Sequence, residues 1–167
     1  TGCPGSAVLG LRALERGDRD APEALREAHL RPRPKIMEGM FLSGSNVNAM
    51  IDVSDGLVQD LGHIAGRSEV SIAIDTGKLS LSLAPEQHAY AERLGVSVME
   101  AALSGGEDYE LAFTVSPQHA SALLTEFTMQ FRLPVTVIGT VGEGPPRVTV
   151  DGQPWQHPGY THFQNLK

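Results

Sequence analysis

The chain has 167 residues, of which 41% are hydrophobic and 20% charged, and its formal net charge is −7. This length suits a single domain with its own core. The acidic balance argues against nucleic acid and anionic membranes as partners, because both attract clustered Lys and Arg. No apolar run approaches the roughly 20 residues that a membrane-spanning helix needs, and the lone Cys3 excludes an internal disulfide framework and a Cys-based zinc site. We therefore expect a soluble cytoplasmic protein.

The spacing of apolar residues predicts helices and strands that alternate without a regular order. In chain order, we expect helices at 6–16, 22–30 and 35–42, a strand at 47–53, a helix at 55–67 and a strand at 70–75. After a loop through Leu83 we expect helices at 85–94 and 96–103, a strand at 107–115, a helix at 117–131 and strands at 135–141 and 147–150. Strands interleaved in this way favour an α+β layered fold.

Several familiar catalytic devices are absent from the sequence. It has no Walker-type phosphate loop, no Gly-x-Gly-x-x-Gly run, no nucleophile elbow and no His-Glu-x-x-His pair. His63 falls on a predicted helix beside core positions, where a surface or hydrogen-bonded histidine is more common than a metal ligand. The chemistry must therefore come from other residues.

The first polar cluster is Asp52-Val53-Ser54-Asp55-Gly56-Leu57, placed between a predicted strand and a predicted helix. Two carboxylates and a hydroxyl within four residues offer the hard oxygen ligands that Mg²⁺ prefers, and the N-terminus of a helix suits phosphate. The alternative is that Ser54 or Asp55 caps the helix and that Asp52 only ends the strand. Capping and ligand binding are compatible.

The second cluster is Ser104-Gly105-Gly106-Glu107-Asp108-Tyr109-Glu110. Paired glycines permit a tight turn or close backbone approach to a ligand. If the strand begins at Glu107, its alternation places Glu107 on the apolar face with Tyr109, and Asp108 and Glu110 on the polar face. Since a carboxylate at the mouth of an apolar face needs a partner, Glu107 is the preferred ligand contact. The alternative is a solvated strand end.

The third cluster, Pro158-Gly159-Tyr160-Thr161-His162-Phe163, brings aromatic residues together in a chain that is only 5% aromatic. Tyr160 can stack on a flat ligand ring. The alternative is that the aromatic residues attach the C-terminal tail to the core.

Taken together, these clusters resemble the thiamine-monophosphate kinase family, which belongs to the superfamily of aminoimidazole ribonucleotide synthetase and selenophosphate synthetase. The resemblance runs nearly from end to end. It includes Thr-Gly-x-Pro-Gly at the start, His-Leu-Arg-Pro-x-Pro at 29–34, Asp-x-Ser-Asp-Gly-Leu at 52–57, Ser-Gly-Gly-Glu-Asp-Tyr-Glu-Leu at 104–111 and Gly-Tyr-x-His-Phe at 159–163. The motifs at 52–57 and 104–111, in this order and spacing, make the resemblance specific.

The resemblance implies particular roles for five residues. Asp52 and Asp55 match positions that hold Mg²⁺, Ser54 matches a position that contacts ATP, and Glu107 and Tyr160 match positions that contact the thiamine phosphate. It also implies a three-layer α/β/α domain with a mixed sheet, related to the ferredoxin-like fold. The reaction would be direct transfer of the γ-phosphoryl group of ATP to thiamine monophosphate, without a covalent catalytic residue.

The chain departs from the family in two respects. Ser6 follows Gly5 where the family commonly has Asp. The N-terminal domain, which in the family carries much of the ATP and Mg²⁺ site and forms the homodimer, has no counterpart here. We therefore interpret residues 1–167 as a single C-terminal domain that is inactive alone. The alternatives are another ATP-using member of the superfamily and a stand-alone binding or assembly module without catalysis.

Overall fold

The computed structural model describes residues 1–156. Its helices are α1 (Ser6–Glu15), α2 (Glu23–Leu30), α3 (Ile36–Ser43), α4 (Leu57–Ser68), α5 (Thr76–Ser80), α6 (Pro85–Leu94), α7 (Val98–Ser104) and α8 (Pro117–Phe131). Its strands are β1 (Val47–Asp52), β2 (Ser71–Ile74), β3 (Leu111–Val115), β4 (Gly139–Gly142), β5 (Arg147–Val150) and β6 (Gln153–Pro154). None of the helices in this part of the chain is long and apolar enough to cross a bilayer.

The described strands form two sheets. β1 and β3 pair in antiparallel fashion, with Asp52 opposite Leu111. The second sheet has the order β4-β2-β5-β6 and is mixed, because β2 and β5 are parallel while the other two pairs are antiparallel. The expected α+β class and the mixed sheet are therefore confirmed, although hydrogen bonds do not join all the strands.

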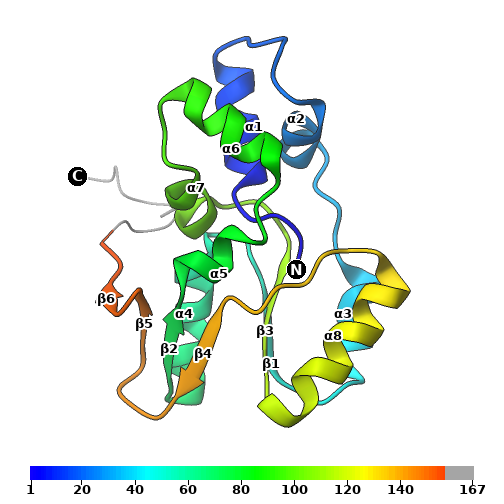
Figure 1. Ribbon diagram of the computed structural model, residues 1–167, viewed down its shortest axis with the longest axis vertical. Coiled ribbons are helices and arrows are strands. Elements are labelled where there is room, and N and C mark those ends of the chain that lie inside the picture. Colours follow the sequence, from blue (N-terminus) through cyan, green and yellow to red (C-terminus); the bar gives the residue numbers. More distant parts are fainter. Residues whose placement is uncertain (157–167) are drawn as a thin grey trace, which may run out of the picture.

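Helices cover the strands from different sides (Figure 1). One face of the β1–β3 pair packs against α3 and α8 through Leu42, Leu123 and Phe127, which are almost fully buried. The other face joins the largest core cluster, in which residues of α4, β2, α7 and β5 meet. Both faces of the pair are thus covered, which explains why neither set of alternating residues in β3 is strongly polar.

A separate group of helices lies at one end of the molecule (Figure 1). α1 packs on α2 and α6 around a second core cluster that includes Leu9, Leu25 and Tyr90. We call α1, α2, α6 and α7 the helical lobe. The first residues of the chain connect this lobe to the strands, because the backbone nitrogen of Thr1 donates to the carbonyl of Leu111 in β3 at 2.7 Å.

Most sequence-predicted elements are present, with three main differences. The predicted loop before Leu83 contains α5, which begins where the Asp75 side chain accepts a hydrogen bond from the N–H of Lys78 at 3.0 Å. The predicted strand at 107–115 begins only at Leu111, and the predicted strand at 135–141 pairs only from Gly139. A strand is stabilised by its neighbours, so a suitable residue pattern without a partner does not form a ladder.

Candidate functional site

Two sequence motifs meet at the end of the β1–β3 pair. The 52–56 loop follows β1 and the 104–110 loop precedes β3. Backbone hydrogen bonds join them beyond the sheet: Val53 N–H donates to the carbonyl of Glu110 at 2.8 Å, Tyr109 N–H to Val53 at 2.9 Å, and Glu107 N–H to Ser54 at 2.8 Å. The two motifs, about 50 residues apart in sequence, therefore form one continuous surface.

Glycines allow this close approach. A Cβ atom on Gly106 would lie 2.5 Å from the Ser54 carbonyl oxygen, and one on Gly56 would lie 2.9 Å from that of Ser104. Gly56 also has φ +122°, which side chains rarely adopt. The glycines in both motifs are thus required for the contact between the loops, whether or not a ligand is bound.

Asp60, in the first turn of α4, holds the backbone of the 52–56 loop by hydrogen bonds. Asp60 is 2% exposed, and its Oδ2 accepts hydrogen bonds from the N–H groups of Ser54 at 2.8 Å and Asp55 at 3.0 Å. Burial raises the pKa of Asp60, these hydrogen bonds oppose the rise, and the nearby charge of Asp55 adds to it. The sequence reasoning gave Asp60 no role. The signal in the sequence is an acidic residue in the first turn of a helix that begins at Gly56-Leu57.

With its backbone fixed, the loop presents its other polar side chains toward solvent. Asp52 is exposed at the end of β1, and Ser54 and Asp55 are half-buried. The prediction that Asp52 ends a strand beside a helix start is confirmed. The alternative that Ser54 or Asp55 caps the helix is wrong, because Gly56 is the N-cap residue and no side chain caps α4 there. The Asp55 carboxylate instead accepts a hydrogen bond from Gln59 Nε2 at 3.4 Å.

The burial of the acids in the 104–110 loop is the reverse of that inferred from strand alternation. Glu107 is exposed and Asp108 is 8% exposed. The alternation argument fails because this segment is not a strand: Glu107 and Tyr109 have φ of 66° and 49°, in the left-handed region. Glu107 remains a candidate ligand contact through its place beside Ser54 and not through the apolar face.

Asp108 joins the 104–110 loop to the helical lobe. Its carboxylate accepts hydrogen bonds from the N–H groups of Gly5 at 2.6 Å and Ala7 at 2.9 Å, at the N-terminus of α1. Burial raises the pKa of Asp108 to about 7, against the opposing effect of these two hydrogen bonds. The buried Gln87 supports the same segment by donating to the carbonyl of Pro4 at 2.9 Å. Residues 1–7, which contain the Thr-Gly-x-Pro-Gly motif, therefore attach the 104–110 loop to α1, and we call them the anchoring segment.

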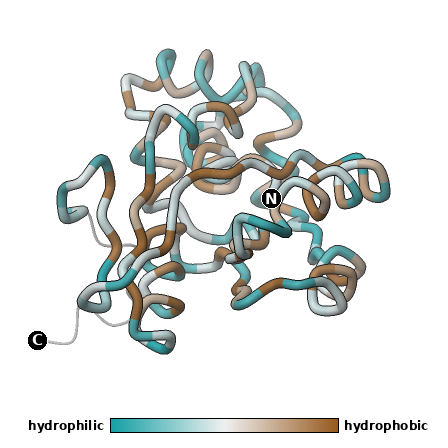
Figure 2. The backbone as a smooth tube through the Cα atoms, turned by 60° about the horizontal axis from the view of Figure 1, so that its bottom comes forward, coloured by the Kyte–Doolittle hydropathy of each residue, from teal (hydrophilic) through white to brown (hydrophobic). Residues whose placement is uncertain are grey.

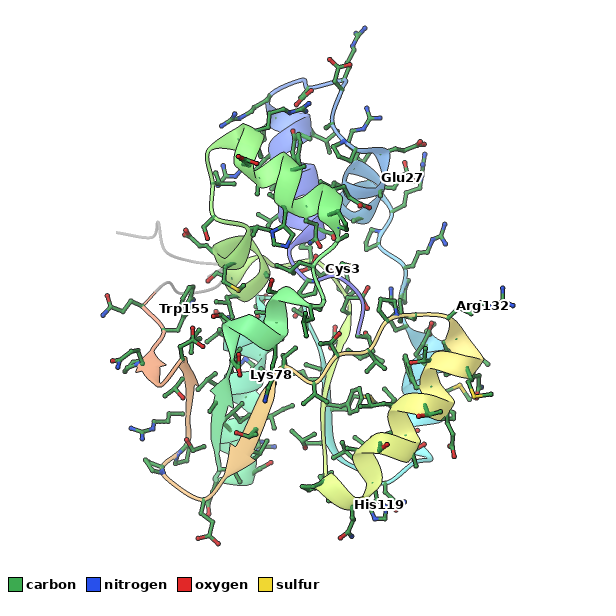
Figure 3. The ribbon with its side chains drawn as sticks, in the orientation of Figure 1. Cys3, Glu27, Lys78, His119, Arg132 and Trp155 are labelled. Atoms are coloured by element: carbon green, nitrogen blue, oxygen red, sulfur yellow. The ribbon has the colours of Figure 1, made fainter. Side chains whose placement is uncertain are left out.

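Neighbouring polar contacts complete the attachment. Lys35 Nζ lies 3.1 Å from Glu110 Oε1, and both side chains are nearly buried. Ser6, at the position where the related family commonly has Asp, donates from its hydroxyl to the carbonyl of Cys3 at 2.8 Å. Trp155, which follows β6, donates from Nε1 to Ser104 Oγ at 2.8 Å and so lies beside the end of α7 (Figure 3). The sequence showed no pattern that would have placed Trp155 here.

The acids at this surface do not form a closed metal cage. Within residues 1–156 no three His, Cys, Asp or Glu side chains are arranged to hold a metal ion. Mg²⁺ commonly binds one or two carboxylates and completes its coordination with water and phosphate oxygens. Exposed Asp52 and half-buried Asp55 fit this open type of site. Tyr160 lies outside the described residues, and His63 is exposed on α4, as expected for a surface histidine.

Comparison with curated proteins gives relatives over almost the whole chain. It is 37% identical over 177 aligned positions to thiamine-monophosphate kinase of Escherichia coli K12, covering 98% of this chain and 51% of that protein. It is 40% identical to thiamine-monophosphate kinase of Aquifex aeolicus, covering 94% of this chain and 47% of the relative. The chain thus spans about half the length of the curated relatives it matches.

Solved structures show the same similarity. A structure of AaThiL complexed with AMPPCP and TMP aligns with a TM-score of 0.82 and 37% identity over 98% of this chain and 50% of that one. Thiamine-monophosphate kinase from Stenotrophomonas maltophilia K279a aligns with a TM-score of 0.80 and 35% identity, over 91% of this chain and 48% of that one. Escherichia coli HypE, a hydrogenase maturation protein, shares the fold at 18% identity and a TM-score of 0.68.

The profile of the family described as AIR synthase related protein, C-terminal domain, matches residues 2–151. This range begins in the anchoring segment and ends after β5, so it includes both loops of the candidate site. The chain belongs to the AIR synthase related C-terminal domain family.

Proposed function

We propose that this chain is the C-terminal part of a thiamine-monophosphate kinase, which transfers the γ-phosphoryl group of ATP to thiamine monophosphate. The observation that carries the proposal is the joining of the 52–56 and 104–110 loops, which brings their acidic and hydroxyl side chains to one surface. It is supported by relatives of that name at 37–40% identity and by the similarity to AaThiL complexed with AMPPCP and TMP.

We assign each candidate residue one role. Asp52 and Asp55 hold Mg²⁺, Ser54 contacts ATP, and Glu107 and Tyr160 contact thiamine monophosphate. The exposure of Asp52 and Glu107 on two hydrogen-bonded loops supports the assignment, because it leaves both carboxylates accessible to ligands. The cationic thiazolium ring of the substrate suits a carboxylate and the face of an aromatic ring.

The main contribution of this chain is positioning. Phosphoryl transfer requires the attacking and leaving oxygens to be held in line, and it needs little covalent participation from the protein. Bound Mg²⁺ would neutralise the negative charge of the converging phosphates. The backbone of the 52–56 loop, fixed by Asp60, would hold Asp52 and Asp55 in place. The backbone hydrogen bond from Glu107 to Ser54 would fix the distance between the loop that binds Mg²⁺ and ATP and the loop that binds thiamine monophosphate.

The remaining parts of the active site lie, in this proposal, in an N-terminal domain of the same polypeptide. Two aspartates and one serine offer no dedicated phosphate cradle, and two carboxylates leave Mg²⁺ dependent on other ligands. The isolated chain should therefore bind ATP–Mg²⁺ no more tightly than about 1 mM, or on the order of −4 kcal/mol, and should not turn over. We also infer that the full-length enzyme is a homodimer in the cytoplasm.

The decisive experiment measures ADP formation by the full-length protein with ATP and Mg²⁺. We expect ADP formation to depend on thiamine monophosphate, and thiamine, which lacks the acceptor phosphate, to be the matched negative control. ADP formation that another small molecule stimulates, with no response to thiamine monophosphate, would instead favour a different ATP-using member of the superfamily. Micromolar ATP affinity or turnover by the 167-residue chain in calorimetry would contradict the two-domain proposal.

A further inference from the structure

The two sheets are separated by a cavity of about 610 Å³. Along one side it is lined by β3 and the residues after it, and along the other by residues 135–141, which lead into β4. Apolar side chains dominate its walls, among them Phe113, Val115, Val137 and Val141. Val137 and Val141 are 50% and 45% exposed. A gap of this composition between two sheets is unusual, because protein interiors are closely packed.

The strand edges that face this cavity pair with no other strand within residues 1–156. β3 pairs only with β1 and β4 pairs only with β2, so neither uses its second edge. Residues 135–138 have the residue pattern of a strand but form no ladder. An unpaired edge presents a row of N–H and carbonyl groups that another strand can bind.

The first residues of the chain already lie at one end of this gap. The backbone nitrogen of Thr1 donates to the carbonyl of Leu111 at 2.7 Å, and Gly2 N–H donates to the carbonyl of Pro134 at 2.8 Å. Thr1 and Gly2 therefore bridge the start of β3 and the start of the segment leading to β4. Figure 1 and Figure 2 both show the N-terminal end in the middle of the molecule.

We propose that one further β-strand fills the cavity, and that the residues directly preceding Thr1 in the full-length protein form this strand. This inference shares one premise with the proposed function, which is that the chain is part of a longer polypeptide. The premise is supported by the relatives, of whose length the chain covers about half. The strand would join the two sheets into one, in the order β1-β3-new strand-β4-β2-β5-β6.

The contacts of Thr1 set the direction and composition of this strand. Thr1 lies beside Leu111, the first residue of β3, whereas the cavity extends along β3 to Pro117. Residues before Thr1 that fill the cavity must therefore run antiparallel to β3, and also antiparallel to residues 135–141. β3 has five residues, so a strand of about five or six residues, near 3.3 Å each, matches it. Because helices cover both faces of β3, we expect apolar and β-branched residues at nearly every position.

Hydrogen–deuterium exchange tests this without reference to catalysis. Within residues 112–115 and 136–141, we expect the amides that point away from β1 and β2 to exchange at least about tenfold more slowly in the full-length protein than in the 167-residue chain. Amides of β2, β5 and α8 should exchange alike in both and serve as the internal control for folding. Equal exchange at 112–115 and 136–141, with the internal controls also equal, would overturn the proposal.

Adding the proposed strand as a separate peptide gives a second test, which needs no substitution in the full-length protein. A synthetic peptide of the eight residues before Thr1, added to the 167-residue chain, should slow exchange at the same amides. A peptide with alternate residues changed to proline, which cannot donate a backbone hydrogen bond, should not. Slowing by both peptides or by neither contradicts the proposal. If the full-length protein lacks kinase activity but protects these amides, only the proposed function fails.

Discussion

The 52–56 and 104–110 loops each present an exposed acid, Asp52 or Glu107, and each is held by a buried acid, Asp60 of α4 or Asp108, but the buried acids act over very different distances along the chain. Asp60 binds the N–H groups of residues five and six positions before it, and so fixes the shape of the 52–56 loop that precedes its helix. Asp108 binds the N–H groups of residues about one hundred positions away, and so joins two parts of the fold. Asp52 and Glu107 are exposed, and within residues 1–156 their carboxylates accept no backbone hydrogen bonds of this kind.

This difference separates positioning from ligand binding within one site. A buried carboxylate that accepts two backbone hydrogen bonds is costly to remove, because its N–H partners stay buried. An exposed carboxylate can be replaced at little cost in stability. Substitutions at the two kinds of acid should therefore affect different measurements, activity in one case and unfolding in the other.

The largest effect should come from Asp52→Asn in the full-length protein. Loss of a metal contact used in the transition state is expected to lower kcat about a hundredfold or more, while the unfolding midpoint stays near that of the wild type. The matched control is Asp20→Asn, an exposed acid between α1 and α2. Turnover close to wild type at saturating Mg²⁺ would remove Asp52 from the metal site.

The next effect should be the loss of stability in Asp108→Asn. The amide cannot accept both hydrogen bonds from Gly5 and Ala7, so we expect the free energy of unfolding in urea to fall by about 2–3 kcal/mol. A change below about 0.5 kcal/mol, the usual size of a surface substitution, would show that the carboxylate does not hold the helical lobe to the 104–110 loop.

The same variant gives a pH test. The pKa of Asp108 is raised from 3.8 to about 7, so the folded state holds a proton that the unfolded state releases between about pH 4 and 7. The free energy of unfolding contributed by Asp108 should therefore fall as pH rises through this range. The difference between wild type and Asp108→Asn should shrink over the same range. If it grows instead, the hydrogen bonds from α1 outweigh burial.

The smallest effect should come from Glu107→Gln and Tyr160→Ala. Each is expected to weaken binding of thiamine monophosphate by about 1–2 kcal/mol, with ATP binding and the free energy of unfolding nearly unchanged. Separate calorimetric titrations of the two ligands measure this. Equal losses for both ligands would assign the two residues a structural role, and would weaken the contrast between exposed and buried acids.

The sequence by itself determined the features that depend on nearby residues. The spacing of apolar residues located α1, α4, α6 and α8 closely, and Pro117 correctly marked the first residue of α8. The strand end at Asp52 and the α+β class also followed from local pattern. These features depend on periods of two or about 3.6 residues and on terminal residues, which act within a few positions of each other.

Only the tertiary structure decided which acids are buried and which strands find partners. Alternation placed Glu107 inward, but two left-handed residues turn the 104–110 loop so that Asp108 is buried against α1. Residues 135–138 have a strand pattern without a ladder, because a strand needs hydrogen-bond partners that lie far away in sequence. Burial and strand pairing are set by contacts between distant segments, and no local pattern contains them.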